Sequence, residues 1–528
     1  MLLKLVIFIS GAAILALELL ASRIMTPYFG VSLYIWAGVL SITLIALAAG
    51  YWAGGKLANA RAIDNDARSM LFGLMPAVAA LFIVLACLIY PFAFAPLAAW
   101  SLSAGSFVAC LILLAVPLLA ASAMNPLLVA IQHNAADTGD GGAGQVFFIS
   151  TVGSVAGVLI TAFGLIPYVA HFDAVLIVAA ALAALSLLIA IKATFKRRTL
   201  VMTASIIGIA ASLLMLWQAD NYTGRKSLIS YHGEQWRIEA TFRSLFGTVK
   251  ILRQQPDGSG YAYRMYFQDG LTQNAVEMDG RSRSFYTYAL EALALAYQPE
   301  ARNALVLGLG AGMTPARLAA RGIKTEIVEI DPASLAASRQ FFGLDESKTP
   351  VHQTDARTFI QRCPGSYDVI VVDLFHGDGT PDYLITRNFF RDLRGCLAAG
   401  GIAVFNTFAD LENTVSYAHL LSTLRAELPH LALFRPNTTG ATHTNSFIVA
   451  SSTPLRPPAR VTMDGVPQRH ETTLWDMLAA PLPLNAALFE GGKIITDARN
   501  QGALDLAHTA RVYRQTILGF TPPEFLLN

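Results

Sequence analysis

Glycines and acidic residues occur in the second half of the chain at spacings that could hold a nucleoside and act on a group attached to it. Gly308-Leu-Gly-Ala-Gly312 comes directly after a short apolar run. Glycines let the backbone approach a ligand closely, and a helix that begins there offers free N–H groups. Glu329, about 20 residues further on, could accept two ribose hydroxyl groups. Asp355 could accept from an adenine amino group, and Asp373 could meet the group that reacts.

Short apolar runs that alternate with helical patterns must position these residues. The runs indicate buried parallel strands over 304–309, 325–330, 351–354, 367–372 and 401–406. Helices are expected between them over 314–321, 333–342, 356–362 and 387–397. This alternation predicts a doubly wound parallel sheet, in which ligands bind beyond the carboxyl ends of the strands. Glu329, Asp355 and Asp373 all follow such ends.

Each acid could instead cap the helix that follows it. Asp331 fits that interpretation best, because Pro332 suits the first position of a helix. Asp355 also fits it fairly well. Glu329 and Asp373 fit it poorly, which favours a role in binding or chemistry for these two.

A smaller β-rich segment precedes the alternating region. Residues 237–253 and 261–268 alternate in polarity, and Pro256-Asp-Gly-Ser-Gly260 between them is a turn signal. We therefore predict a β-hairpin domain over 230–275, followed by a helix over 282–297.

The first half of the chain has the composition of a membrane domain. Hydrophobic residues make up 54% of the protein and charged residues 14%, where soluble proteins carry about 25% charged residues. The deficit is local, because residues 1–218 hold only 15 charged side chains and the other 310 residues hold 59. Seven stretches reach the roughly 20 apolar residues that span a bilayer: 3–22, 33–53, 70–90, 105–131, 146–167, 172–192 and 199–217.

Two features of these stretches bear on packing and continuity. Prolines in the stretch 92–131 leave open a division into a re-entrant piece and a span. Gly153-Ser-Val-Ala-Gly157 is a GxxxG motif, which predicts a seam where two helix backbones approach closely.

The basic residues give conflicting information about orientation. They cluster after the second stretch (Lys56, Arg61, Arg68) and after the sixth (Lys196, Arg197, Arg198). The positive-inside rule makes that side cytoplasmic, and seven passes then leave residues 219–528 on the other side. Two cysteines, Cys363 and Cys396, offer a check, because a Cα separation of about 4.4–6.8 Å would permit a disulfide and support that other side.

Several classes of function are disfavoured by composition and motifs. A net charge of +2 gives no long-range field that would attract nucleic acid. The four cysteines form no CxxC motif or Cys/His cluster with metal spacing, so no metal is expected.

The soluble half resembles the spermidine synthases (polyamine aminopropyltransferases) over about residues 240–410. The segments that carry the resemblance are 243–247, 269–273, 304–313, 328–331 and 367–373. The membrane half resembles multi-pass spermidine-synthase-like proteins through 50–57 and 151–157, as does Ile495-Thr-Asp-Ala-Arg-Asn500 near the end. The resemblance implies a multi-pass α-helical membrane domain (1–218), a small β-hairpin domain (230–275) and an α/β Rossmann, methyltransferase-like domain (280–452). A C-terminal helical tail (453–528) is expected after these.

The resemblance also implies a site. The residues expected to bind S-adenosylmethionine or its decarboxylated form are Gln273, Gly308, Gly310, Gly312, Glu329, Asp355 and Ala356. Asp373 is the expected base that deprotonates an attacking amine. His376 is a second candidate base beside it, because the pKa of histidine suits that role.

Three departures from the family pattern predict altered polyamine recognition. Ala311 stands where the family has an Asp that binds the amine of the donor's aminopropyl arm. His376 stands where the family has a second acidic anchor. Tyr286-Thr-Tyr288 replaces Tyr-His-Glu. Each lost contact to a charged amine removes about 1.5–3 kcal/mol, which disfavours ordinary spermidine synthesis. The Asp of the family would also repel the carboxylate of intact S-adenosylmethionine, so Ala311 would let that molecule serve as donor.

Three functions stay open on these grounds. The first is a spermidine synthase-like transferase that alkylates a small-molecule amine. The second is an S-adenosylmethionine methyltransferase acting on a membrane-proximal small molecule, and the third is a nucleoside-binding transporter or sensor without enzyme activity. The expected partners are the amine and the lipid bilayer of the inner membrane, with a homodimer left open. Because S-adenosyl donors are cytosolic, their supply favours a cytoplasmic soluble domain over a periplasmic one.

Overall fold

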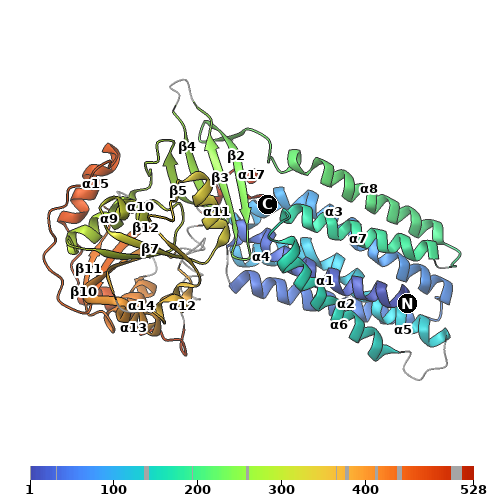
Figure 1. Cartoon of the computed structure of the whole chain (residues 1–528). Helices are drawn as coiled ribbons and strands as arrows, with labels where there is room; N and C mark the ends of the chain where they lie inside the picture. The colour runs from blue at the N-terminus through green and yellow to red at the C-terminus, as the bar shows by residue number, and fades with distance from the viewer. Residues whose placement is uncertain are drawn as a thin grey trace. The chain divides into compact units, whose positions relative to one another are not determined.

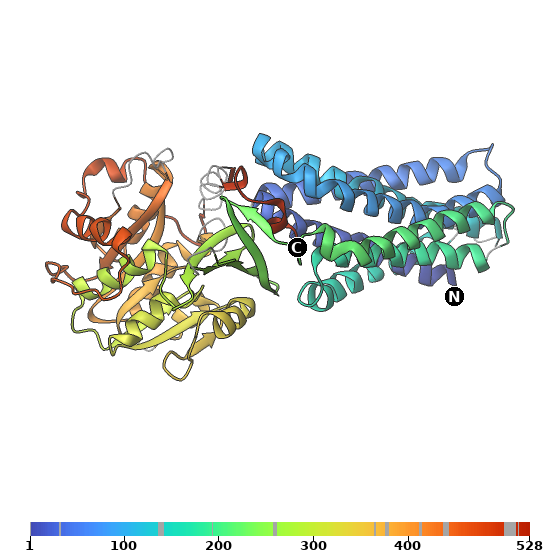
Figure 2. The same cartoon turned by 90° about the horizontal axis from the view of Figure 1, so that it is seen from above.

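The protein folds as two compact units, which we call the helical unit and the soluble unit. The computed structural model describes residues 2–30, 33–135, 142–192, 194–256, 261–363, 366–374, 380–410, 414–436, 443–500, 514–515 and 517–528. The helical unit comprises Met1–Tyr231 with Gln515–Asn528, and the soluble unit comprises His232–Arg514. Figures 1 and 2 show the elements of each unit.

The helical unit contains, among its described residues, seven helices long and apolar enough to cross a membrane. Its helices are α1 (Leu2–Phe29), α2 (Leu33–Asn59), α3 (Asn65–Trp100), α4 (Leu102–Cys110), α5 (Val116–Ala135), α6 (Ala143–Ile160), α7 (His171–Lys192) and α8 (Arg198–Tyr222). They run alongside one another in both views (Figures 1 and 2). The predicted count of seven long apolar helices is confirmed for the described residues.

The proline-rich stretch ends one span and begins the next. Helix α3 continues through Pro91 and Pro96 to Trp100. Ser101 then caps α4, because its Oγ accepts from the backbone N–H of Ala104 at 3.2 Å. A π-helical turn, Leu111–Ala115, joins α4 to α5, and together they form the fourth span, Leu102–Gln132.

The GxxxG segment packs α6 directly against α1. A Cβ atom added at Gly153 or Gly157 would fall on backbone carbonyl groups of α1. Ser154 lies between these glycines in the sequence. Its hydroxyl donates to the carbonyl oxygen of Gly11 on α1 at 3.0 Å. Small residues thus let the two backbones meet.

The two ends of the helical unit carry different groups. At one end, the backbone N–H of Lys196 donates to Asp66 Oδ1 at 2.9 Å, which joins the α7–α8 loop to the start of α3. At the other end, Gln515 Nε2 donates to the carbonyl oxygen of Ala98 at 3.2 Å. The backbone N–H of Phe172 there donates to the carbonyl oxygen of Asn528 at 2.7 Å. The C-terminal segment therefore belongs to the end opposite the basic loops.

The predicted C-terminal tail is consequently divided between the units. Helix α15 (Gln468–Ala479) packs against α9 in the soluble unit, whereas α17 (Pro523–Leu526) packs against α3 in the helical unit. Phe525 and Leu526 are each 1% exposed. Burial of such apolar side chains stabilises this segment on the helices, so the described parts of the range 453–528 belong to two units and not to one tail.

The soluble unit contains an antiparallel sheet and a larger mixed sheet. The short strand β1 (Ile229–Tyr231) precedes the antiparallel strands β2 (Glu234–Arg243), β3 (Thr248–Gln254), β4 (Tyr263–Gln268) and β5 (Leu271–Glu277), which pair in sequence order. The strands of the mixed sheet are β6 (Asn303–Leu307), β7 (Lys324–Glu329), β8 (Val351–Gln353), β9 (Tyr367–Val372), β10 (Leu397–Asp410), β11 (His430–Phe434) and β12 (His443–Ser451).

The mixed sheet has the order β11-β12-β10-β9-β6-β7-β8. Five strands from β10 to β8 are parallel, as predicted, while β12 runs antiparallel to β10 and β11 antiparallel to β12. Its helices are α9 (Phe285–Tyr297), α10 (Met313–Ala320), α11 (Pro332–Phe341), α12 (Ala356–Ile360), α13 (Arg387–Cys396) and α14 (Thr414–Arg425), with 3₁₀ turns at Asp382–Leu384 and Ala486–Phe489. The α/β fold with a preceding β domain is therefore confirmed, with two antiparallel strands added.

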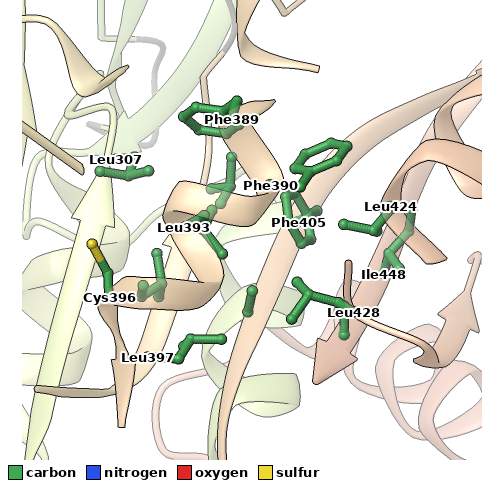
Figure 3. Close-up of a cluster of buried hydrophobic side chains, with 14 of the residues drawn as sticks. Leu307, Phe389, Phe390, Leu393, Cys396, Leu397, Phe405, Leu424, Leu428 and Ile448 are labelled. Atoms are coloured by element: carbon green, nitrogen blue, oxygen red, sulfur yellow. The ribbon is translucent and has the colours of Figure 1, made fainter. Parts of the chain in front are cut away.

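Alternate residues of the central strands pack into separate hydrophobic cores on the two faces of the mixed sheet. Leu305 and Leu307 of β6 pack in a cluster with α13 and α14, while Val306 packs in a cluster with α9. Figure 3 shows the first cluster, in which Phe389, Phe390 and Leu393 of α13 lie beside Leu307 and Phe405. Burial on both faces explains the continuous apolar runs of these strands.

Candidate active site

A cavity of about 420 Å³ lies within the soluble unit at the carboxyl ends of the parallel strands. Its lining includes Gly308 after β6, Glu329 at the end of β7, Asp355 after β8 and Asp373 after β9. Four separate stretches of sequence therefore converge on one space. The remaining walls come from β4 and β5, from α9 and from residues 381–384.

The glycine loop, residues 308–312, follows β6, and its first residue approaches the backbone of Asp373 closely. The backbone N–H of Gly308 donates to the carbonyl oxygen of Val328 at 2.9 Å, and its φ is +95°. A Cβ atom here would fall on the carbonyl oxygen of Asp373, so only glycine fits. Gly310 also lines the cavity, whereas Gly312 (φ +73°) begins α10 outside the lining.

Ala311 also lies outside the cavity lining. Its side chain is 2% exposed and packs in an apolar cluster with Val249, Tyr266 and Met313. The position where the resemblance implies an acid is thus an apolar core position in this protein.

Glu329 connects the glycine loop to the end of β7. One carboxylate oxygen accepts from the backbone N–H of Leu309 at 2.9 Å, and the other accepts from that of Asp331 at 2.7 Å. Each oxygen has a second lone pair, so the group can still accept from a ligand in the cavity. Burial raises the pKa of Glu329 to about 7, against the opposing effect of the two N–H donors.

Asp331 and Asp355 both cap helices, and both line the cavity. Asp331 accepts from the backbone N–H of Ala333 at 2.8 Å at the start of α11. Asp355 Oδ1 accepts from the N–H of Thr358 at 2.9 Å at the start of α12. Its Oδ2 accepts from the hydroxyl of Tyr383 at 2.8 Å. Ala356, the first residue of α12, lies in the lining beside it.

Asp373 belongs to a polar chain that crosses three strands. Asn406 Nδ2, on β10, donates to Asp373 Oδ1 at 2.8 Å. Asn445 Nδ2, on β12, donates to Asn406 Oδ1 at 2.9 Å, which orients the Asn406 amide group with its N–H toward Asp373. Burial raises the pKa of Asp373 to about 6, while the hydrogen bond from Asn406 lowers it. A buried carboxylate with this pKa can accept a proton near neutral pH.

Gln273 of β5 and Tyr286 of α9 also line the cavity. Tyr286 lies in the first turn of α9. Its hydroxyl accepts from Asn274 Nδ2 at 3.1 Å. Burial raises the pKa of Tyr286 well above its ordinary value, and the charge of Asp373 raises it further. Tyr286 therefore stays a neutral hydrogen-bonding group.

The side chains of the described lining that can carry a charge near neutral pH are all acids. Glu329, Asp331, Asp355 and Asp373 line the cavity, and its described residues include no Lys, Arg or His. The site thus favours a cationic ligand that also offers hydroxyl or amino donors. Among the described residues no group of three His, Cys, Asp or Glu could hold a metal ion.

Of the candidates from the sequence, Gln273, Gly308, Gly310, Glu329, Asp355, Ala356 and Asp373 line one cavity. His376 lies outside the described residues. Sequence reasoning missed Asn406, Asn445 and Tyr383. Asn406 ends the apolar run 401–406. A polar residue at the end of a predicted parallel strand was a signal that could have identified it. Asn445 sits on an antiparallel strand that was not predicted, so no signal pointed to it.

Residues 283–434 match the family model described as the spermine/spermidine synthase domain, so the predicted resemblance is confirmed for the soluble unit. Over 138 residues the chain is 41% identical to the N-terminal histidine N-methyltransferase of Emericella nidulans, covering 25% of this chain and 24% of that protein. Over 151 residues it is 35% identical to the polyamine aminopropyltransferase of Vibrio vulnificus, covering 27% and 50%. The chain thus spans half or less of the length of these two curated relatives.

The comparison with solved structures includes the spermidine synthase of Thermotoga maritima. It aligns at 16% identity with a TM-score of 0.38, over 48% of this chain and 90% of that chain.

Proposed function

We propose that the soluble unit, which carries the spermine/spermidine synthase domain, binds an S-adenosyl donor and transfers its alkyl group to an amine. The convergence of Glu329, Asp355 and Asp373 on one cavity with no described cation is the observation that supports this most directly. A sulfonium donor is a cation with a ribose and an adenine. Glu329 would accept from the ribose hydroxyls, and Asp355 would accept from the adenine amino group.

The transfer would proceed by a single displacement. Asp373 accepts a proton from the ammonium form of the acceptor, which exposes the nitrogen lone pair. This nitrogen attacks the carbon bonded to the sulfonium sulfur, a C–N bond forms and the C–S bond breaks. The bonding electron pair stays on sulfur, so the donor leaves as a neutral thioether.

Methyl transfer from intact S-adenosylmethionine is the second candidate. The apolar core position of Ala311 favours it, because no carboxylate on the glycine loop is then available to bind the amine of an aminopropyl arm. The relative from Emericella nidulans is named for methyl transfer to a nitrogen, and that from Vibrio vulnificus for aminopropyl transfer. Both candidates use the same base and the same donor wall.

The thioether product distinguishes these candidates. Full-length protein in nanodiscs is incubated with either donor and a panel of amines. Aminopropyl transfer releases methylthioadenosine, whereas methyl transfer releases S-adenosylhomocysteine. We expect one of these thioethers together with an alkylated amine. Donor binding without either product would contradict the enzyme proposal and support a nucleoside-binding transporter or sensor.

For the membrane side, we propose that the soluble unit lies outside the cytoplasm, against the expectation from donor supply. Five candidate spans lie between it and the basic α2–α3 loop, and one, α8, lies between it and the basic α7–α8 loop. Both numbers are odd, so the soluble unit lies on the side opposite the basic loops, which the positive-inside rule makes cytoplasmic. Cys363 and Cys396 are joined in a disulfide with their Cα atoms 5.5 Å apart, and disulfides persist in oxidising compartments. The donor would then have to be supplied across the membrane.

Labelling of single introduced cysteines tests the membrane side. Glu490→Cys places an exposed thiol in the soluble unit, and Arg61→Cys places one in the α2–α3 loop. The native thiols of Cys87 and Cys110 are buried. In intact cells a membrane-impermeant maleimide should label the first variant and spare the second. Labelling of the loop variant alone would place the soluble unit in the cytoplasm.

A further inference from the structure

The segment Ile495–Asn500 contacts the residues that support one wall of the cavity. Asp497 forms an ion pair with both terminal nitrogens of Arg357 on α12, one at 3.0 Å. Thr386 Oγ1 donates to the same carboxylate at 2.7 Å. The backbone carbonyl of Ile495 accepts from the N–H of Arg387 at 2.8 Å. We call Ile495–Asn500 the latch.

Arg357 carries this contact to the cavity. Its Nη1 also donates to the backbone carbonyl of Tyr383 at 3.1 Å. The hydroxyl of Tyr383 in turn donates to Asp355 Oδ2 at 2.8 Å. Tyr383 and Asp355 both line the cavity, so a chain of polar contacts runs from Asp497 to the wall that faces the ligand.

A second contact holds the same wall from the other end of the latch. Asn500 Nδ2 donates to the backbone carbonyl of Asp382 at 3.0 Å and to its Oδ2 at 3.2 Å. Asp382 lies between Pro381 and Tyr383, which line the cavity. The wall is a 3₁₀ turn of three residues, Asp382–Leu384. Such a short turn has few hydrogen bonds of its own, so outside contacts must hold its position.

We infer that Asp497 and Asn500 are positioning residues that hold residues 381–384 against the bound donor. The identity of that donor rests on the proposed function, whereas the contacts to the wall do not. No latch residue lines the cavity, and no contact described for the latch reaches Asp373. The latch should therefore govern donor binding and leave the transfer step unchanged once donor is bound.

Donor titrations of full-length protein in nanodiscs test this inference. Asp497→Asn removes the charge of the ion pair, and Asn500→Ala removes the contact to Asp382. Glu490→Gln is the matched control, because Glu490 is an exposed acid of the same C-terminal region and does not line the cavity. The probes are S-adenosylmethionine, its decarboxylated form and S-adenosylhomocysteine.

We expect Kd and KM for the donor to rise severalfold in Asp497→Asn and in Asn500→Ala, the size expected for a partly exposed ion pair and a neutral hydrogen-bond contact. The kcat at saturating donor should stay within about twofold, and the control should match the wild type. Unchanged Kd in both variants would overturn the inference, as would a fall in kcat with unchanged KM.

Hydrogen exchange of the wall, residues 381–384, tests without any ligand whether the latch holds it in position. Amides of residues 380–390 should exchange faster in Asp497→Asn than in the wild type or in Glu490→Gln, with no change in β6 or β9. Equal exchange in all three proteins would overturn the inference. If the wild type binds none of the three probes, the proposed function fails, while the exchange result still shows whether the latch positions the wall.

Discussion

Asp373→Asn is expected to lower kcat by about a thousandfold, the middle of the range for removal of a general base. The substitution keeps the shape of the side chain, and its Oδ1 can still accept from Asn406. It removes the only property that the proposed step requires, which is the ability to accept a proton. Aliphatic amines with a pKa near 10 are almost fully protonated at neutral pH, so transfer without a base would be slow.

Donor binding and an acid on β9, the strand that Asp373 follows, provide the controls. We expect the Kd for the donor to stay within about threefold in Asp373→Asn, because a neutral isostere preserves the wall. Asp368→Asn changes an acid at the other end of β9, whose carboxylate accepts from the backbone N–H groups of Arg302 and Asn303. That variant should lose stability and keep its kcat. Wild-type kcat in Asp373→Asn would contradict the assignment of the base.

The pH dependence of the same reaction follows from the raised pKa of Asp373. Only the ionised carboxylate accepts a proton, so the rate should rise as the pH increases through about 6. Asn406→Leu removes the hydrogen bond that lowers this pKa, and the rise should then move to higher pH. A purely structural effect of Asn406→Leu would lower the rate equally at every pH.

Glu329→Ala is expected to weaken donor binding by more than about a hundredfold, because two effects combine. The ribose loses a charged acceptor, which is worth about 1.5–3 kcal/mol. The backbone N–H groups of Leu309 and Asp331 lose their partner, and each buried unsatisfied group costs about 1–3 kcal/mol. The second effect releases the glycine loop, so the adenosine side of the cavity loses its shape as well.

Isothermal titration with S-adenosylhomocysteine measures this loss, and thermal unfolding measures the accompanying change in stability. Glu326→Ala is the matched control on β7. Glu326 contacts His352 at 2.8 Å and Tyr367 at 3.3 Å, away from the cavity. We expect this control to bind the ligand as the wild type does. Tight binding by a folded Glu329→Ala protein would show that Glu329 does not hold the donor.

Local signals in the sequence were sufficient for the long helices, for the parallel strands and for most residues that line the cavity. Long apolar stretches predicted the seven long helices, because a stretch of about 20 apolar residues is long enough to cross a bilayer as a helix. Gly308, Glu329, Asp355 and Asp373 could be predicted together, because the carboxyl ends of parallel strands share one edge of the sheet. Residues far apart in sequence can therefore be predicted to lie close together before the structure is known.

The contacts that position these groups depend on the tertiary structure alone. Asn406 reaches Asp373 only because β10 pairs with β9, and Asn445 joins them only through the antiparallel strand β12. The latch meets Arg357 across 140 residues, and the last residues of the chain return to the helical unit. A hydrogen bond requires two groups about 3 Å apart, and side-chain periodicity within one element cannot specify the distance between two elements. The sequence by itself therefore determined which groups could do chemistry, and the packing of sheets and helices decided which of them are held in place to do it.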